Sequence, residues 1–199
     1  RSVGIRWADT VESCDVKSVT SSLYAQGINA RSVSGCHVRY ISGLSGTTTV
    51  GIGGINVSHC VVETISILGT GISAQQVTNN TITEVGTGIF LGGHGLAKDN
   101  TIRANEYGIR TDPGSRIISN TIEGNSMSTG TGIYYANLSN SMLIEDNHVA
   151  YWQTGINSST GLVRRNNVGG CTTPYTISAG MVVVPITALG TNPNANVSF

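Results

Sequence analysis

The sequence predicts an all-β fold in which one strand-rich unit of about 20 residues is repeated eight times. Three observations support this prediction. Every unit contains a Gly-Ile step, every unit contains an Asn or Cys anchor, and a Val or Ile always stands two positions after the anchor. Strand-length segments that recur at a fixed period are typical of a solenoid, whose coils stack on one another. The anchors are Cys14, Cys36, Cys60, Asn80, Asn100, Asn120, Asn147 and Asn166.

Four positions of each coil are expected to face the interior: the anchor, the residue three before it, the residue two after it and usually the residue five after it. Parallel strands lie about 4.8 Å apart, so equivalent residues of successive coils form ladders. A buried Asn ladder at a turn can bond the backbone of its own coil and the amide of the next coil. Asn also tolerates the left-handed backbone conformation that such a turn can require.

Cys replaces Asn at the first three anchors, and two interpretations compete. Cys14, Cys36 and Cys60 form either a metal or disulfide site or a reduced ladder that fills the turn. Stacking in register puts their Cβ atoms about 4.8 Å apart, whereas disulfides prefer roughly 3.5–4.5 Å. A straight column of thiolates also cannot surround a tetrahedral zinc ion. We therefore expect free, inward-facing cysteines, with Cys171 also buried.

Charged residues make up only 11% of the chain, and eleven basic and eleven acidic residues give a formal net charge of zero. A nucleic-acid partner is not expected, because the basic stripe of such proteins is missing. No apolar run approaches the roughly 20 residues of a membrane span, so no membrane partner is expected either. We expect no cofactor. Arg39 and Glu63, and Arg103 and Glu123, are expected to pair across neighbouring coils.

The repeats are expected to occupy residues 1–168, and a C-terminal cap and tail residues 169–199. Gly169-Gly170 and Pro174 interrupt the pattern, and the apolar segment 181–186 is expected to cover the last coil. Insertions between repeats often build the binding surface of a solenoid. The longest insertions span residues 42–49, 125–131 and 136–142.

No cap is recognisable ahead of Gly4, so we expect the chain to be a piece of a longer protein. The first coil would then present an unpaired strand edge and the apolar side chains of Ile5, Val11, Val16 and Val19. An exposed end of this kind invites pairing with another chain. We therefore expect self-association through the N-terminal coil.

The repeat resembles the right-handed parallel β-helix of the pectin-lyase-like superfamily over residues 4 to about 168. The resemblance is carried by the Asn-Thr-Ile triplets at 80–82, 100–102 and 120–122, each followed by a Gly-Ile step. It implies a single-stranded right-handed parallel β-helix of about eight coils with a short C-terminal cap. It also implies an extracellular or cell-surface bacterial protein and an acidic polysaccharide as ligand. The superfamily includes lyases, hydrolases and repeat domains without known activity, so the fold does not fix the activity.

Candidate catalytic residues are hard to find in this chain. Glycosidases pair two acids about 5–9.5 Å apart, but no outward column holds acids on two successive coils. The triplet Asp112-Pro113-Gly114 resembles the Asp-Pro-His of alginate epimerases, yet Gly114 stands in place of the His, and an ordinary turn explains the triplet better. His37 and His148 share a column on distant coils, so no histidine metal site is expected.

One outward column is the best candidate for a ligand site. Phe90, Arg110 and Tyr134 stand on successive coils, each two residues after the Gly of a Gly-Ile step, and Asp112 is the next outward residue beside Arg110. Such a ladder either stacks on sugar rings and binds a carboxylate, or merely packs as a cation–π stack. The leading hypothesis is a non-catalytic β-helix domain of a larger extracellular bacterial protein with a structural or polysaccharide-binding role. The alternative is a polysaccharide lyase or glycoside hydrolase acting on acidic polysaccharide.

Overall fold

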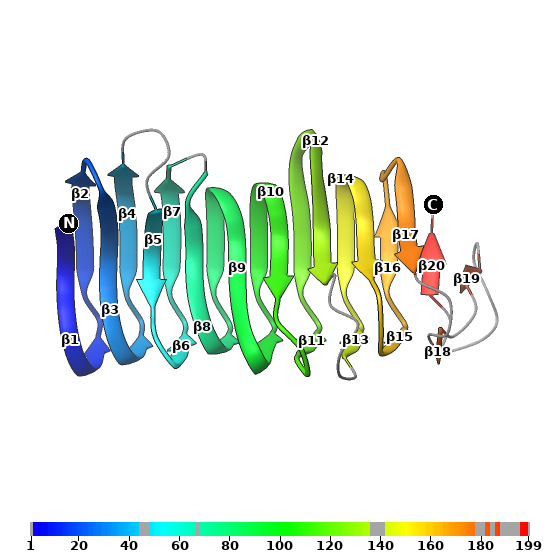
Figure 1. Ribbon diagram of the computed structural model, residues 1–199, viewed down its shortest axis with the longest axis horizontal. Coiled ribbons are helices and arrows are strands. Elements are labelled where there is room, and N and C mark those ends of the chain that lie inside the picture. Colours follow the sequence, from blue (N-terminus) through cyan, green and yellow to red (C-terminus); the bar gives the residue numbers. More distant parts are fainter. Residues whose placement is uncertain are drawn as a thin grey trace.

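The chain winds into coils that stack one on another from the N-terminal to the C-terminal end of the molecule (Figure 1). The computed structural model describes residues 2–43, 48–66, 68–135, 142–177, 182–183, 186–187 and 196–198. Within these ranges every strand pairing is parallel and no helix occurs. The prediction of an all-β parallel solenoid of about eight coils is therefore confirmed. Of the expected insertions, residues 44–47, residues 136–141 and the side chains of 126–128 lie outside the described part.

Each coil contributes three strand segments, and the longer strands run through more than one of them. The strands are β1 (Ser2–Glu12), β2 (Asp15–Ser21), β3 (Tyr24–Ser34), β4 (His37–Gly43), β5 (Thr48–Gly53), β6 (Asn56–Ser58), β7 (Val61–Ile65), β8 (Thr70–Thr78), β9 (Thr81–Lys98), β10 (Thr101–Thr111), β11 (Arg116–Ile118), β12 (Thr121–Tyr135), β13 (Leu143–Glu145), β14 (His148–Ser158), β15 (Leu162–Arg164), β16 (Asn167–Gly169), β17 (Thr173–Ile177), β18 (Val182–Val183), β19 (Ile186–Thr187) and β20 (Asn196–Ser198).

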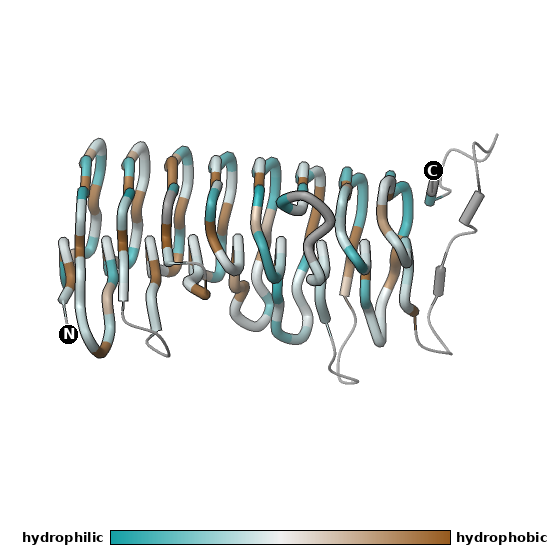
Figure 2. The backbone as a smooth tube through the Cα atoms, turned by 90° about the horizontal axis from the view of Figure 1, so that it is seen from above, coloured by the Kyte–Doolittle hydropathy of each residue, from teal (hydrophilic) through white to brown (hydrophobic). Residues whose placement is uncertain are grey.

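The interior is built from the predicted apolar ladders. Ile82, Ile102 and Ile122, each two residues after an anchor, pair in register and are at most 1% exposed. The residues three before the anchors are buried in every coil, from Val11 to Val163. Figure 2 shows hydrophobic positions recurring from one coil to the next along the stack. Because each ladder runs the length of the stack, the core is continuous.

The glycines of the Gly-Ile steps are required by the close approach of neighbouring coils. A Cβ atom on Gly108 would lie 2.2 Å from Cγ2 of Ile122 and 2.5 Å from the carbonyl oxygen of Gly132. Gly88 and Gly132 face the same two obstacles, the β-branched side chain after the anchor and the backbone of the next coil. The strict glycine in this column therefore has a packing cause.

The Asn anchors form a buried hydrogen-bond ladder, as predicted. Asn100 donates from Nδ2 to the carbonyl of Val77 and to Oδ1 of Asn120, both at 2.9 Å. Its Oδ1 accepts hydrogen bonds from the backbone N–H and from Nδ2 of Asn80, both at 3.0 Å. Asn120 and Asn147 repeat this arrangement on the following coils. Each rung thus satisfies its own amide and the buried backbone of its neighbours.

The left-handed residue of this turn is the one before the anchor, and not the anchor itself. These residues have φ between 51° and 60° in all eight coils: Ser13, Gly35, His59, Asn79, Asp99, Ser119, Asp146 and Arg165. Since the preceding residue makes the turn, the anchor side chain is free to enter the interior. The tolerance of Asn for a left-handed conformation is therefore not used at the anchor, and its hydrogen-bonding capacity explains the column.

The cysteines continue the ladder with weaker bonds. All four are free, as predicted, although Cys14 and Cys171 are only partly buried. The Cys60 thiol donates to the carbonyl of Ser58 at 3.2 Å, and the backbone N–H of Cys60 donates to Oδ1 of Asn80 at 2.9 Å. Burial raises the pKa of Cys60 to about 11, so the thiol stays protonated and unreactive at neutral pH.

A further rung that the sequence pattern did not reveal lies near the C-terminus. Oδ1 of Asn196 accepts hydrogen bonds from the backbone N–H and from Nδ2 of Asn166, both at 3.0 Å. Nδ2 of Asn196 donates to the carbonyl of Val163, as an internal anchor does. β17 and β18 also pair in parallel with β14 and β15. Parallel pairing therefore continues beyond residue 168.

The two ion pairs expected between neighbouring coils, Arg39 with Glu63 and Arg103 with Glu123, are not found among the described residues. Arg39 pairs with Asp15 of the preceding coil, with Nη2 2.9 Å from Oδ2, while Glu63 contacts His37. Among the described residues no ion pair joins Arg103 and Glu123, the other pair that was expected. Each of these outward side chains has more than one charged neighbour within reach, so strand register alone does not determine their pairing.

Two coils also depart from the inward position five after the anchor. A register irregularity between Ile102 and Ala104 makes Ala104 pair with Val85, and Ala104 is fully buried. Asn105 is only half-buried, and its Nδ2 donates to the carbonyl of Val85 at 3.0 Å. Asn125 donates in turn to Oδ1 of Asn105 at 2.9 Å. A second, short Asn ladder thus replaces the expected inward pair.

The first coil is less well covered than the second. Ile5 and Val19 are only partly buried, whereas Ile28 and Ile41, their partners in the next coil, are fully buried. This difference leaves apolar surface at the N-terminal end of the described chain. Self-association through this coil stays a prediction.

Candidate ligand-binding face

The predicted outward column forms one continuous line along a sheet. The pairings run from Arg6 through Asn29, Gly53 and Ser73 to Phe90, Arg110, Tyr134 and Asn157. Phe90 lies in β9, Arg110 in β10 and Tyr134 in β12, so three adjacent strands present them. Arg110 is exposed, while the two rings are half-buried.

Arg110 lies against two aromatic rings, but one of them is not the expected ring. Its guanidinium carbon is 5.9 Å from the centroid of Phe90 and 5.8 Å from that of Tyr107. Tyr107 packs in turn on Tyr134, with 5.1 Å between centroids and a tilt of 45°. These distances are within the range of cation–π and aromatic pairs. Phe90, Tyr107, Arg110 and Tyr134 are referred to below as the aromatic–arginine cluster.

Sequence reasoning missed Tyr107 because strand alternation places residues three apart on opposite faces. Here Gly108 and Ile109 are both buried, so the strand turns its two neighbours, Tyr107 and Arg110, to the same outer face. The signal was available in the Gly-Ile step, because a buried pair of consecutive residues breaks the period of two. Tyr107 is then the natural third ring of the cluster.

Asp112 lies beyond the cluster, in the turn after β10. Its backbone N–H donates to the carbonyl of Leu91 at 3.0 Å, and its own carbonyl accepts from the hydroxyls of Thr111 and Ser115. The Asp112 side chain is exposed. Within the described residues no ion pair joins it to Arg110. Both charges therefore remain accessible to a ligand.

A histidine from the preceding coil lies against the same turn. A Cβ atom on Gly114, which has φ of 77°, would meet Nδ1 of His94 at 2.5 Å. The backbone N–H of His94 donates to the carbonyl of Pro113 at 2.9 Å. The imidazole of His94 thus occupies the space where a side chain at position 114 would begin.

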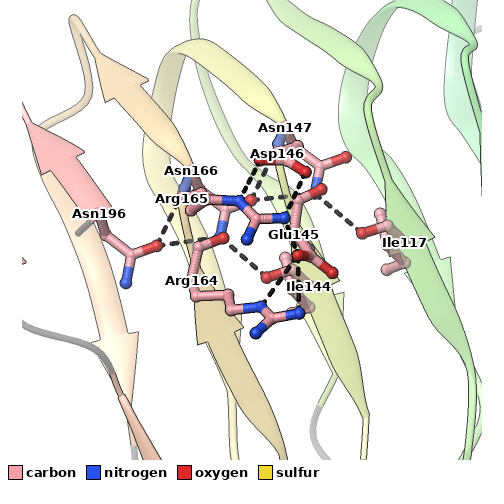
Figure 3. Close-up of polar contacts among 9 residues, drawn as sticks. All are labelled: Ile117, Ile144, Glu145, Asp146, Asn147, Arg164, Arg165, Asn166 and Asn196. Carbon is pink, nitrogen blue, oxygen red and sulfur yellow. Dashed lines mark hydrogen bonds and ion pairs between the residues drawn. The ribbon is translucent and has the colours of Figure 1, made fainter. Parts of the chain in front are cut away.

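The densest cluster of charges lies on the turn beside the Asn ladder (Figure 3). Arg165 binds Asp146 through two bonds, Nε to Oδ1 at 2.7 Å and Nη2 to Oδ2 at 2.9 Å. Arg164 donates from Nε to Oε1 of the buried Glu145 at 2.9 Å, and Arg165 also contacts this oxygen. The hydrogen bonds from Arg165 hold the pKa of Asp146 below its usual value. This cluster ties coil seven to coil eight, and every charge in it has a partner.

Among the described residues no group of three or more His, Cys, Asp or Glu side chains is arranged to hold a metal ion. The described ranges also contain no helix with the length and apolar character needed to cross a membrane.

Comparison with known proteins agrees with the architecture. The family model for the right-handed β-helix region matches residues 65–187, which is more than half of the chain. Comparisons with curated proteins and with solved structures gave no significant match. The resemblance of the repeat to the pectin-lyase-like superfamily is consistent with this match. Together with the parallel ladders described above, the match places this chain in the right-handed β-helix family.

Proposed function

We propose that this chain is a non-catalytic β-helix repeat domain of a larger extracellular protein, and that it binds acidic polysaccharide on its aromatic–arginine cluster. The observation that carries the proposal is an exposed Arg110 flanked by the rings of Phe90 and Tyr107. Half-buried rings offer apolar faces to sugars, and a guanidinium binds a carboxylate through two parallel hydrogen bonds.

The charge environment of Arg110 supports an anionic ligand. No carboxylate of the described residues lies within ion-pair distance of its guanidinium. The two rings fix the orientation of the long side chain, which lowers the entropy lost when it binds a ligand. A uronate carboxylate would therefore meet a positioned and unpaired cation.

Binding of hexagalacturonate, measured by calorimetry and by electrophoresis in gels that contain polygalacturonate, tests the proposal. Arg110→Ala should weaken binding by about tenfold or more, and Arg110→Lys should restore only part of it, because Lys lacks the bidentate geometry. Arg103→Ala is the matched control, since Arg103 is an exposed arginine of the same strand. Equal affinity of the Arg110→Ala and Arg103→Ala proteins would rule the cluster out.

The enzyme alternative is favoured by one specific observation, the position of His94 over Gly114 beside the exposed Asp112. A histidine and a carboxylate next to a bound uronate are suitable groups for proton transfer. Incubation with pectin, polygalacturonate and alginate, followed by assays of unsaturated uronates and reducing ends, tests it. Product that disappears in both His94→Ala and Asp112→Asn would establish catalysis. Product that no single substitution of an Asp, Glu or Arg removes would indicate contamination.

A further inference from the structure

A bulge in the first strand forces one large aromatic side chain outward. Arg6 pairs with Asn29 and Ala8 pairs with Ala30, so Trp7 is an extra residue without a pairing partner in β3. Trp7 has φ of 57° and is 72% exposed, while Arg6 lies 5.6 Å from its ring centroid. Bulges redirect side chains, and this one takes Trp7 out of the paired ladder. Packing does not explain this tryptophan, which is among the most exposed large apolar residues described.

A groove opens directly beside Trp7. It has a volume of about 580 Å³, a size typical of ligand pockets, and spans the first three coils. Gly53 and Gly54 line it on the third coil, where the outward column lacks side chains. Asn29 in the middle coil of the groove lies on the same line of paired residues as Arg110, four coils away, which corresponds to about 19 Å.

Polar groups line the groove in a fixed arrangement. Gln26 is only 3% exposed, and its amide accepts a hydrogen bond from the Tyr24 hydroxyl at 2.6 Å and donates to the carbonyl of Ile28 at 3.1 Å. Asn29 adds a second amide, and one acid and one base, Asp9 and Arg31, stand at the exposed rim. The lining therefore carries no net charge, unlike the aromatic–arginine cluster with its unpaired cation.

We propose that the groove beside Trp7 is a second carbohydrate site, which takes neutral sugar residues by stacking them on the indole. The proposal deepens the polysaccharide-binding function and rests on it only for the class of ligand. An exposed indole provides a large apolar surface for a pyranose ring, and the amides and the Tyr24 hydroxyl are suited to sugar hydroxyls. The residues that line the groove carry no net charge in sum, so they lose little on binding an uncharged sugar.

Tryptophan fluorescence gives a direct test, because Trp7 is exposed and Trp152 is 1% exposed in the core. Cellohexaose, mannohexaose and xylohexaose are the neutral probes, and hexagalacturonate is the acidic probe. We expect at least one neutral probe to shift the emission to shorter wavelength and to protect Trp7 from iodide quenching. Trp7→Ala should lower the affinity for that probe by about tenfold or more.

Two further variants, one inside the groove and one outside it, complete the test. A Cβ on Gly53 would meet Nε2 of Gln26 at 2.3 Å, so Gly53→Ala should displace the Gln26 amide and weaken binding without removing Trp7. Tyr151→Ala is the control, because Tyr151 is also exposed and left-handed, with φ of 64°, but lies outside the groove. Unchanged fluorescence with all three neutral probes at millimolar concentration would overturn the proposal. An emission wavelength that changes with protein concentration but not with added sugar would also overturn the proposal. It would identify the groove as a contact between copies of the chain. Neither result would affect hexagalacturonate binding through Arg110.

Discussion

Replacing Asn100 by Ala tests whether the Asn ladder holds the coils together. Asn100 is 1% exposed, and its side chain takes part in four hydrogen bonds, two accepted from Asn80 and two donated to Val77 and Asn120. Four bonds at roughly 0.5–1.5 kcal/mol each set a range of roughly 2–6 kcal/mol. Neighbouring bonds of one network are not additive, and the buried partners can relax, so we expect about 2–3 kcal/mol.

Urea unfolding monitored by circular dichroism measures this loss, provided that the slope of the transition is unchanged. Thr101→Ala, at the exposed neighbouring position, should stay within about 0.5 kcal/mol of the parent. Asn100→Cys should fall between the two, because the natural cysteine anchors make similar but longer bonds. Amide exchange at Asn80 should also accelerate in Asn100→Ala, since that N–H loses its acceptor. A change in stability within about 0.3 kcal/mol would show that the ladder contributes nothing, and the reasoning would be wrong.

In the native protein Cys60 should react with a thiol reagent far more slowly than after denaturation, because burial raises its pKa to about 11; a disulfide in the native protein would contradict this. Arg165 lowers the pKa of Asp146, so this carboxylate stabilises the fold above its ordinary pKa of about 4 and loses that contribution as pH falls through its lower folded value. Asp146→Asn should therefore flatten the decline of stability below about pH 4 more than Asp99→Asn does, and equal acid profiles would exclude the ion pair as the cause. Finally, the partly buried Ile5 of the first coil predicts concentration-dependent association, and sedimentation as a strict monomer at high concentration would refute it.

The fold could be predicted from the sequence because each inward position repeats with the same chemistry. Ile102 and Gly108 have equivalents in every coil, and packing between coils allows few alternatives there. The anchor column was predicted correctly, although the residue before the anchor, such as Asn79, makes the left-handed turn. Asn196 escaped notice because the segment before it breaks the period, while its hydrogen bonds are those of any other rung.

The candidate sites were harder to predict because they depend on local departures from the repeat. Tyr107 joins the cluster only because two consecutive residues, Gly108 and Ile109, are buried and break strand alternation. Trp7 is exposed only because a bulge removes it from the ladder of paired residues, and the periodic pattern of the sequence does not predict a bulge. Phe90, Arg110 and Tyr134 were placed correctly in register, since the Gly-Ile step fixed their column.

The chemistry of the outer face is therefore separable from the stability of the coil. Ile109 is fully buried and fills the core. Arg110, its neighbour in the sequence, points outward and lies against the rings of Phe90 and Tyr107. A substitution at Arg110 can change ligand binding at little cost to folding, because exposed positions away from special backbone conformations seldom alter stability by more than about 0.5 kcal/mol. Gly108 has no such freedom, since any Cβ would collide with Ile122 and with the next backbone. A solenoid of this kind can thus vary its ligand along one outward column while the adjacent inward columns stay fixed, and binding differences between its coils should follow the outward residue alone.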